Sequence, residues 1–112
     1  MMDAHEFVVC WKREKETLLR AFQDSSTESK VSSAIASLNL SQEHLITMNE
    51  ILDTVLTDTF YSLLLGLDGE ASIGGVQETY KIYDEQDRLI SNCGEIEAAA
   101  WEQFYGEDEV QD

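Results

Sequence analysis

Apolar residues recur at helical spacing in the first part of the chain. Residues 3–22 carry them one, three, four and seven positions apart, so that most share one stripe: Phe7, Val8, Trp11, Leu18, Leu19 and Phe22. Asp3 is placed to cap this helix. A polar turn over residues 23–29 leads into a short helix whose apolar side carries Val31, Ile35 and Leu38.

The longest predicted helix covers residues 42–65, with Ser41 as its N-cap and Gly66 as its C-cap. Its inward stripe follows near-heptad spacing and is widened by three further residues: Leu45, Met48, Leu52, Val55, Thr59 and Leu63, then Ile51, Leu56 and Phe60. So broad a stripe indicates a helix committed to the core. Its polar side holds four acids and no base: Glu43, Glu50, Asp53 and Asp58.

The period changes after Gly66. Residues 67–75 are a glycine-rich loop, and residues 76–83 alternate between two faces as a strand does. The polar residues 84–87 predict a tight turn, after which residues 88–91 return as a second strand. A two-stranded hairpin is barely stable by itself, so we expect it to lie on the helices or to extend a sheet of a partner.

A last helix is predicted from Glu95 to Tyr105, capped by Asn92 and stopped by Gly106. The fold class is therefore α+β and mostly helical: a core of three N-terminal helices, a two-stranded antiparallel β-hairpin and a C-terminal helix. Residues 1–106 form a single globular domain, and residues 107–112 are an acidic tail that we expect to be flexible.

Charge changes this picture most. The 112 residues hold 23 acidic and 7 basic side chains, for a net charge of −16, and residues 1–20 sum to zero. The whole excess lies on residues 21–112, which repel nucleic acid and anionic membranes and attract a basic protein surface. In the first helix, Lys12, Arg13 and Lys15 lie opposite the apolar stripe, either as a solvated face or paired with the acidic remainder of the chain.

Candidate chemistry is sparse. His5 and His44 lie far apart and neither has the spacing of a zinc ligand pair. Cys10 lies among apolar neighbours, where burial would make its thiol inert, and Cys93 has no histidine near it in sequence. We expect reduced structural thiols, no catalytic residue, no metal site and no cofactor. The chain shows no signal peptide and no long apolar run, which favours a cytoplasmic location.

The C-terminal third combines aromatic side chains with acids. Trp101 and Tyr105 share one face of the last helix, and Tyr83 lies on the predicted hairpin. Aromatic anchors beside charges of one sign are typical of interface hot spots. We therefore predict a partner-binding surface made of nine residues: Glu78, Tyr83, Asp84, Glu85, Asp87, Glu97, Trp101, Glu102 and Tyr105.

In size, charge and lack of a catalytic constellation, the chain resembles bacterial immunity proteins, which neutralise the nuclease domain of a cognate toxin. The resemblance implies a one-to-one complex in which acidic side chains cover a basic active site, and it implies that the chain is not an enzyme. The partner would be a basic protein, with no nucleic acid or membrane bound. Two alternatives stay open: a nucleic-acid mimic that inhibits a DNA-binding system, and a small enzyme with a site that the sequence does not display.

Overall fold

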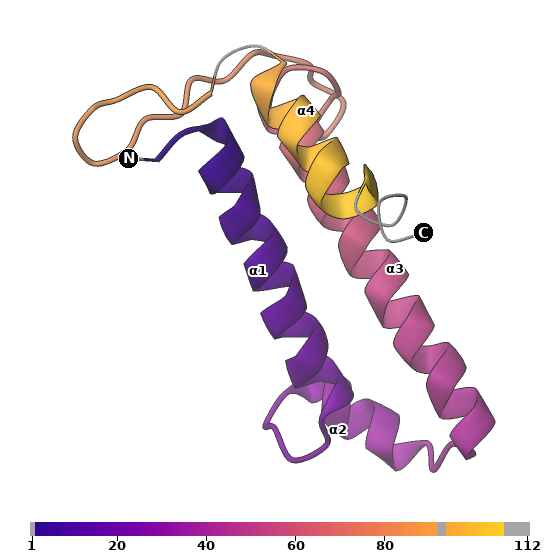
Figure 1. Cartoon of the computed structure of the whole chain (residues 1–112). Coiled ribbons are helices and arrows are strands. Elements are labelled where there is room, and N and C mark those ends of the chain that lie inside the picture. The colour runs from indigo at the N-terminus through magenta and orange to yellow at the C-terminus, as the bar shows by residue number, and fades with distance from the viewer. Residues whose placement is uncertain (1, 92–93, 107–112) are drawn as a thin grey trace.

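The computed structural model describes residues 2–91 and 94–106, and these are mostly helical. α1 (Ala4–Gln23) and α3 (Gln42–Leu67) form a long antiparallel pair (Figure 1). α2 (Lys30–Ser37) lies at the end where α3 begins, and α4 (Glu95–Trp101) packs beside the other end of the pair. A π-helical turn, η1 (Glu102–Gly106), continues α4. None of the described helices is long and apolar enough to cross a membrane.

Side chains just before the helices fix where they begin. The backbone N–H of Glu6 donates to Asp3 Oδ1 at 2.8 Å, which confirms the predicted cap of α1. Ser41 caps α3 in the same way, through the N–H of His44. The predicted C-cap is wrong, because α3 continues through Gly66 and ends at Leu67, with Asp68 as its cap. Gly66 instead leaves room for the side chain of Ile73, with which a β-carbon at position 66 would clash.

The core lies at the end of the molecule where α4 packs on the pair. Its buried residues come from α1, α3, α4 and η1: Ala4, Val8, Leu64, Ile96, Ala99, Ala100 and Phe104. Partly buried aromatic side chains pack around them. Trp11 packs edge-on against Phe60, with ring centroids 5.6 Å apart. These small alanines let α4 approach the pair closely, and the apolar burial stabilises the three-helix arrangement.

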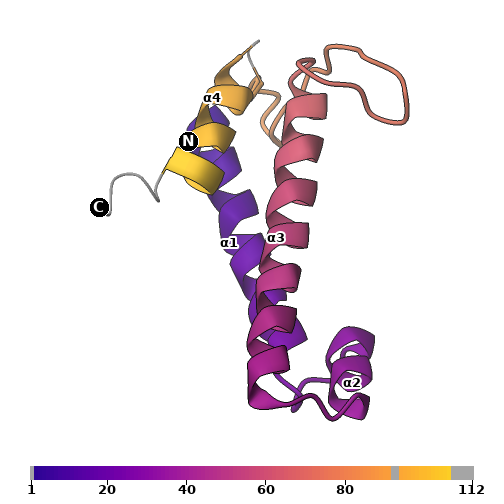
Figure 2. The ribbon, with the colours of Figure 1, turned by 90° about the vertical axis from the view of Figure 1, so that its right-hand side faces the viewer.

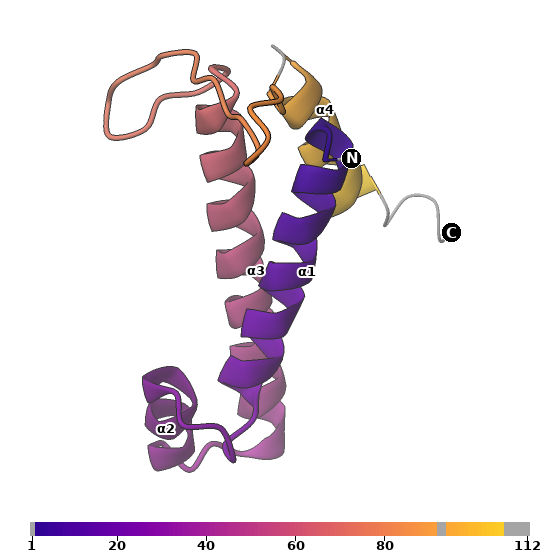
Figure 3. The ribbon, with the colours of Figure 1, turned by 90° about the vertical axis from the view of Figure 1, so that its left-hand side faces the viewer.

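Beyond the reach of α4 the molecule is thin. α4 and α2 lie on opposite sides of the α1–α3 pair and at opposite ends of it (Figures 2 and 3). The radius of gyration is 16.5 Å, against about 13 Å for a compact chain of about this length. The expectation that α3 is committed to the core is therefore wrong: Ile51 and Val55, both in its predicted inward stripe, are about half exposed.

The predicted β-hairpin is also wrong. In the part of the chain that the structure describes, the segment between α3 and α4 forms isolated bridges and no strand ladder. Tyr83 pairs with Leu89, and the Ile90 N–H donates to the Ile82 carbonyl at 2.7 Å. The Ile82 N–H, which would make the next bond of a ladder, donates to the Ser91 hydroxyl at 3.0 Å instead. That hydroxyl in turn donates to the Tyr80 carbonyl at 3.1 Å, so a side chain replaces backbone pairing. Ile90 then turns inward and is buried. The fold is helical with one long irregular loop.

The remaining expectations concern the C-terminal part of the chain and the thiol of Cys10. The last helix begins at Glu95 as predicted, but its final turn widens into η1 and ends at Gly106. The proposed cap Asn92, the thiol of Cys93 and the tail over residues 107–112 lie outside the described residues. Cys10 is exposed, so the expectation that burial makes its thiol inert is wrong.

Candidate functional site: an acidic and aromatic face

A buried carboxylate positions α4 on the end of α3. Gly94, the N-cap of α4, has no side chain to offer and adopts a left-handed conformation with φ of 88°. The missing acceptor comes from Asp68, which is only 2% exposed and whose Oδ2 accepts the backbone N–H of Glu97 at 2.9 Å. A carboxylate at a helix N-terminus also interacts favourably with the helix dipole. The end of one helix therefore fixes the start of the next.

Three aromatic rings line the outer junction between α3 and α4. Tyr61 packs edge-on against Tyr105 with centroids 4.8 Å apart, and Tyr105 lies 5.3 Å from Trp101. The Tyr105 hydroxyl donates to Asp58 Oδ1 at 3.0 Å. We call Tyr61, Tyr105 and Trp101 the aromatic ladder. Its outermost member, Trp101, is 50% exposed, so a large apolar surface faces water. The contact with Tyr105 restrains the position of this ring.

Acidic side chains surround the aromatic ladder. Glu97 lies one helical turn before Trp101 on the same face of α4, and Glu102 follows Trp101 and is exposed. Residues 95–106 and 42–67 contain no Lys or Arg. We call this combined surface the acidic–aromatic face, made of Asp58, Tyr61, Glu97, Trp101, Glu102 and Tyr105. It can offer ring surface and negative charge to one partner at once.

The hydroxyl groups of the aromatic ladder respond to this environment. Burial raises the pKa of Tyr105 above its usual value, and the hydrogen bond to Asp58 raises the pKa further. Burial also raises the pKa of Tyr61, with a smaller contribution from the charge of Glu97. Both side chains stay protonated and neutral at physiological pH, so the negative charge of the face comes from its carboxylates.

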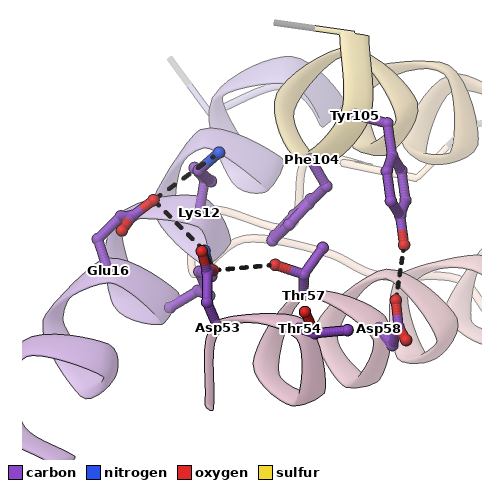
Figure 4. Close-up of a pocket in the computed structure, with 9 residues that line it drawn as sticks. Lys12, Glu16, Asp53, Thr54, Thr57, Asp58, Phe104 and Tyr105 are labelled. Atoms are coloured by element: carbon purple, nitrogen blue, oxygen red, sulfur yellow. Dashed lines mark hydrogen bonds and ion pairs between the residues drawn. The ribbon is translucent and has the colours of Figure 1, made fainter. Parts of the chain in front are cut away.

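A polar pocket of about 340 Å³ opens beside the acidic–aromatic face, between α1, α3 and η1 (Figure 4). Lys15 is buried there, bonded to Asp53, with Glu16 3.6 Å away. Lys12 donates to the Gln103 carbonyl at 2.7 Å and lies 5.5 Å from the centre of the Phe104 ring. Of the two interpretations of the basic residues in α1, pairing with the acidic remainder is confirmed for Lys15. The pocket joins three elements through internal ion pairs.

No match to this chain was found among protein-family models, curated proteins or solved structures.

The structure divides the nine sequence-predicted binding residues into two groups. Four of them belong to the acidic–aromatic face: Glu97, Trp101, Glu102 and Tyr105. The other five lie on the irregular loop that projects from the end of the α1–α3 pair (Figure 1): Glu78, Tyr83, Asp84, Glu85 and Asp87. In this group Tyr83 is exposed, as are Glu78, Glu85 and Asp87.

Asp84 has a structural task within that loop. Its Oδ1 accepts the backbone N–H groups of Gln86 and Arg88, both at 2.9 Å, and its Oδ2 accepts the Arg88 guanidinium at 3.1 Å. The N–H of Arg88 is the main reason why the pKa of Asp84 lies below its usual value. Asp87 follows with φ of 63°, a left-handed conformation that Asp tolerates better than most residues. Asp84 therefore shapes the loop and offers little free charge.

Sequence reasoning missed two members of the face, Asp58 and Tyr61. Asp58 was placed on the polar side of the long helix but, like Tyr61, was not among the nine predicted binding residues. A spacing of three residues places both on one side of α3. That spacing, next to a base-free acidic stretch, was the available signal. In the described part of the chain, no group of three or more His, Cys, Asp or Glu side chains converges as a metal site would.

Proposed function

We propose that this protein is an immunity-type inhibitor that binds a basic, nucleic-acid-cleaving toxin domain and covers its active site or substrate-binding surface. The observation that carries the proposal is the position of Trp101. Half of this side chain faces solvent, yet it packs on Tyr105, which Asp58 holds in place. An exposed ring with restrained neighbours loses little conformational freedom when it is covered, as an interface anchor should.

The charge of the face selects the class of partner. Asp58, Glu97 and Glu102 surround the rings without a nearby base in α3 or α4. Such a field accelerates encounter with a cationic surface and disfavours an anionic one. A nuclease domain presents cationic surface because it must bind phosphates. Carboxylates would occupy the places of the phosphates, while Trp101 supplies the apolar contact.

A protein partner accounts for the rings better than the alternative of general nucleic-acid mimicry. A mimic needs carboxylates at phosphate-like spacing, and it should inhibit several unrelated DNA-binding proteins. The aromatic ladder supplies specific ring contacts, which suit one complementary partner.

The test is capture followed by an activity assay. The wild-type chain and a Trp101→Ser variant would each be tagged and expressed in the source cell, and captured proteins would be identified and assayed for nuclease activity. We expect a basic nuclease domain that the wild-type chain inhibits one-to-one and the variant inhibits less. Inhibition of several unrelated DNA-binding proteins would favour the mimic instead. Capture of a neutral or acidic partner would contradict the proposal.

A further inference from the structure

The acidic–aromatic face continues along α3 past the end of η1. Thr54 lines the polar pocket and also a shallow groove of about 280 Å³ on the outer side of α3. Because the two hollows share this residue, they are adjacent on one surface. We call the second surface the lower α3 face, made of the residues that line this groove: Thr47, Glu50, Ile51, Thr54 and Val55. It lies on the thin part of the molecule, which α4 does not reach (Figure 2).

The lower α3 face exposes more apolar surface than its local fold requires. Of its apolar residues, Ile51 is 50% exposed and Val55 55%. A helix that carries apolar side chains this far around its circumference usually has neighbours on more than one side. Here α1 packs along one side of α3 and α2 lies near Leu45 at its start, while Ile51 and Val55 stay exposed. Removing this remaining apolar surface from water would stabilise a complex.

Charge decides between candidate occupants. Glu43 and Glu50 are exposed beside these apolar residues, and α3 contains no Lys or Arg. A second copy laid against this face would oppose acid to acid. The chain's own residues 107–112 hold four acids and no base, so their charge opposes binding here as well. A partner segment with apolar residues on one side and Lys or Arg beside them would complement both the exposed apolar side chains and the acids of this face.

We propose that the lower α3 face binds an amphipathic, cationic helix of the partner. The apolar side of that helix packs on Ile51 and Val55, and its Lys or Arg side chains reach Glu43 and Glu50. The stretch from Glu43 to Asp58 is about 22 Å long at 1.5 Å per residue, which matches a helix of about four turns. Recognition of a helix by such a groove is a recurrent binding mode. This inference rests on the proposed function for the partner's charge, and it adds the partner's local structure and a second contact surface.

The experiment uses a synthetic probe, because the inference specifies a chemistry. A labelled peptide of about 18 residues, with Leu and Lys segregated at helical spacing, would be titrated with the full chain by fluorescence anisotropy. A peptide of the same composition with Leu and Lys intermixed controls for charge. We expect the segregated peptide to bind more tightly, and Ile51→Ser to weaken that binding by about fivefold to tenfold.

Leu63→Ser is the matched control variant. Leu63 is also an exposed apolar residue of α3, at 41%, but lies three turns beyond Ile51 and outside the lower α3 face. It should leave the affinity unchanged, and circular dichroism should show that both variants keep their helices. Equal binding of the two peptides would overturn the inference, as would equal losses from both variants or a loss from Trp101→Ser alone. Sedimentation as a dimer that Ile51→Ser dissociates would assign the face to a second copy.

The two proposals can fail separately. If the captured nuclease binds Ile51→Ser as tightly as wild type, the helix site is wrong and the proposed function stands. If the peptide results are as expected but the captured partner is not a nuclease, the helix site stands and the immunity function is wrong.

Discussion

The carboxylate of Asp68, at the end of α3, accepts the backbone N–H of Glu97, in the first turn of α4. These residues are 29 positions apart, and Gly94, the N-cap of α4, makes no side-chain hydrogen bond to the helix. The bond fixes the register of α4 on the α1–α3 pair. It thereby fixes where Trp101 and Tyr105 emerge on the surface.

Replacing Asp68 by Ala should lower the free energy of unfolding by about 0.5–2 kcal/mol, the usual cost of losing a helix cap. Asp68→Asn keeps an acceptor oxygen and should lose less. Urea unfolding monitored by circular dichroism measures both. Equal midpoints for Asp68→Ala and wild type would show that packing alone positions α4.

Two adjacent leucines provide a test of where the core lies. Leu64 is fully buried, whereas Leu63 is 41% exposed. Leu64→Ala should cost about 2–5 kcal/mol through lost burial and a cavity. Leu63→Ala should cost less than about 1 kcal/mol, because a large part of the side chain that it removes already contacts water. Thermal unfolding of both variants decides this, and a larger loss at Leu63 would mean that the helix is rotated from the orientation described.

The two side chains of the Lys15–Asp53 ion pair are buried to very different extents. The Lys15 side chain is 6% exposed and that of Asp53 51%. Asp53→Ala leaves a buried ammonium whose remaining partner is Glu16, and we expect a loss of about 1–3 kcal/mol. Lys15→Met leaves a carboxylate that water can solvate, and should cost less than about 1 kcal/mol. Denaturant midpoints check the order, which fails if Lys15→Met is the more destabilising change.

The starts of α1 and α3 were the most predictable part of the fold. Asp3 and Ser41 cap by local hydrogen bonds to residues three positions later, so the sequence around each cap is sufficient to find it. The end of α3 depends on distant contacts. Gly66 stays helical because Ile73 packs against it and because Asp68, two residues on, is held by α4.

The prediction of a hairpin was wrong for a similar reason, because the structure of this segment depends on contacts outside the local pattern. Residues 76–83 alternate as a strand does, but alternation does not show whether a ladder will close. Ser91 Oγ accepts a hydrogen bond from the N–H of Ile82, and the side chain of Ile90 is buried. Both effects depend on contacts that a local pattern does not encode. Likewise, helical periodicity marked α3 as amphipathic but did not reveal that the fold covers one of its sides and leaves Ile51 and Val55 exposed.

The raised pKa values of Tyr61 and Tyr105 predict a loss of stability in alkali. Each pKa is higher in the folded chain than the ordinary value of 10.0, so the unfolded chain releases these protons first and gains stability as pH rises above 10. Their contribution to folding is therefore complete at neutral pH and declines through the folded-state pKa. Asp58→Asn should lower the pKa of Tyr105 towards 10.0, measured by tyrosinate absorbance. An unchanged titration would contradict the role of Asp58.

The final prediction separates steering charges from the aromatic anchor in partner binding. The association rate should fall by about an order of magnitude or more from low to high salt, as it does for steered encounters. Glu85→Lys in the loop and Glu102→Lys beside Trp101 should lower the association rate with little change in thermal midpoint, because both side chains are exposed. Trp101→Ser should chiefly raise the dissociation rate, because anchors act after docking.

Asp84 must be kept out of that comparison. Asp84→Lys removes the acceptor of the Gln86 and Arg88 N–H groups, so it would alter the loop as well as the charge. Surface plasmon resonance with the captured partner gives both rate constants for each variant. If Glu85→Lys has no effect while Glu102→Lys slows association, the loop does not take part in binding and the acidic–aromatic face alone steers the partner. If neither charge reversal nor salt changes the association rate, electrostatic steering is wrong, and the affinity must come from apolar contacts such as Trp101.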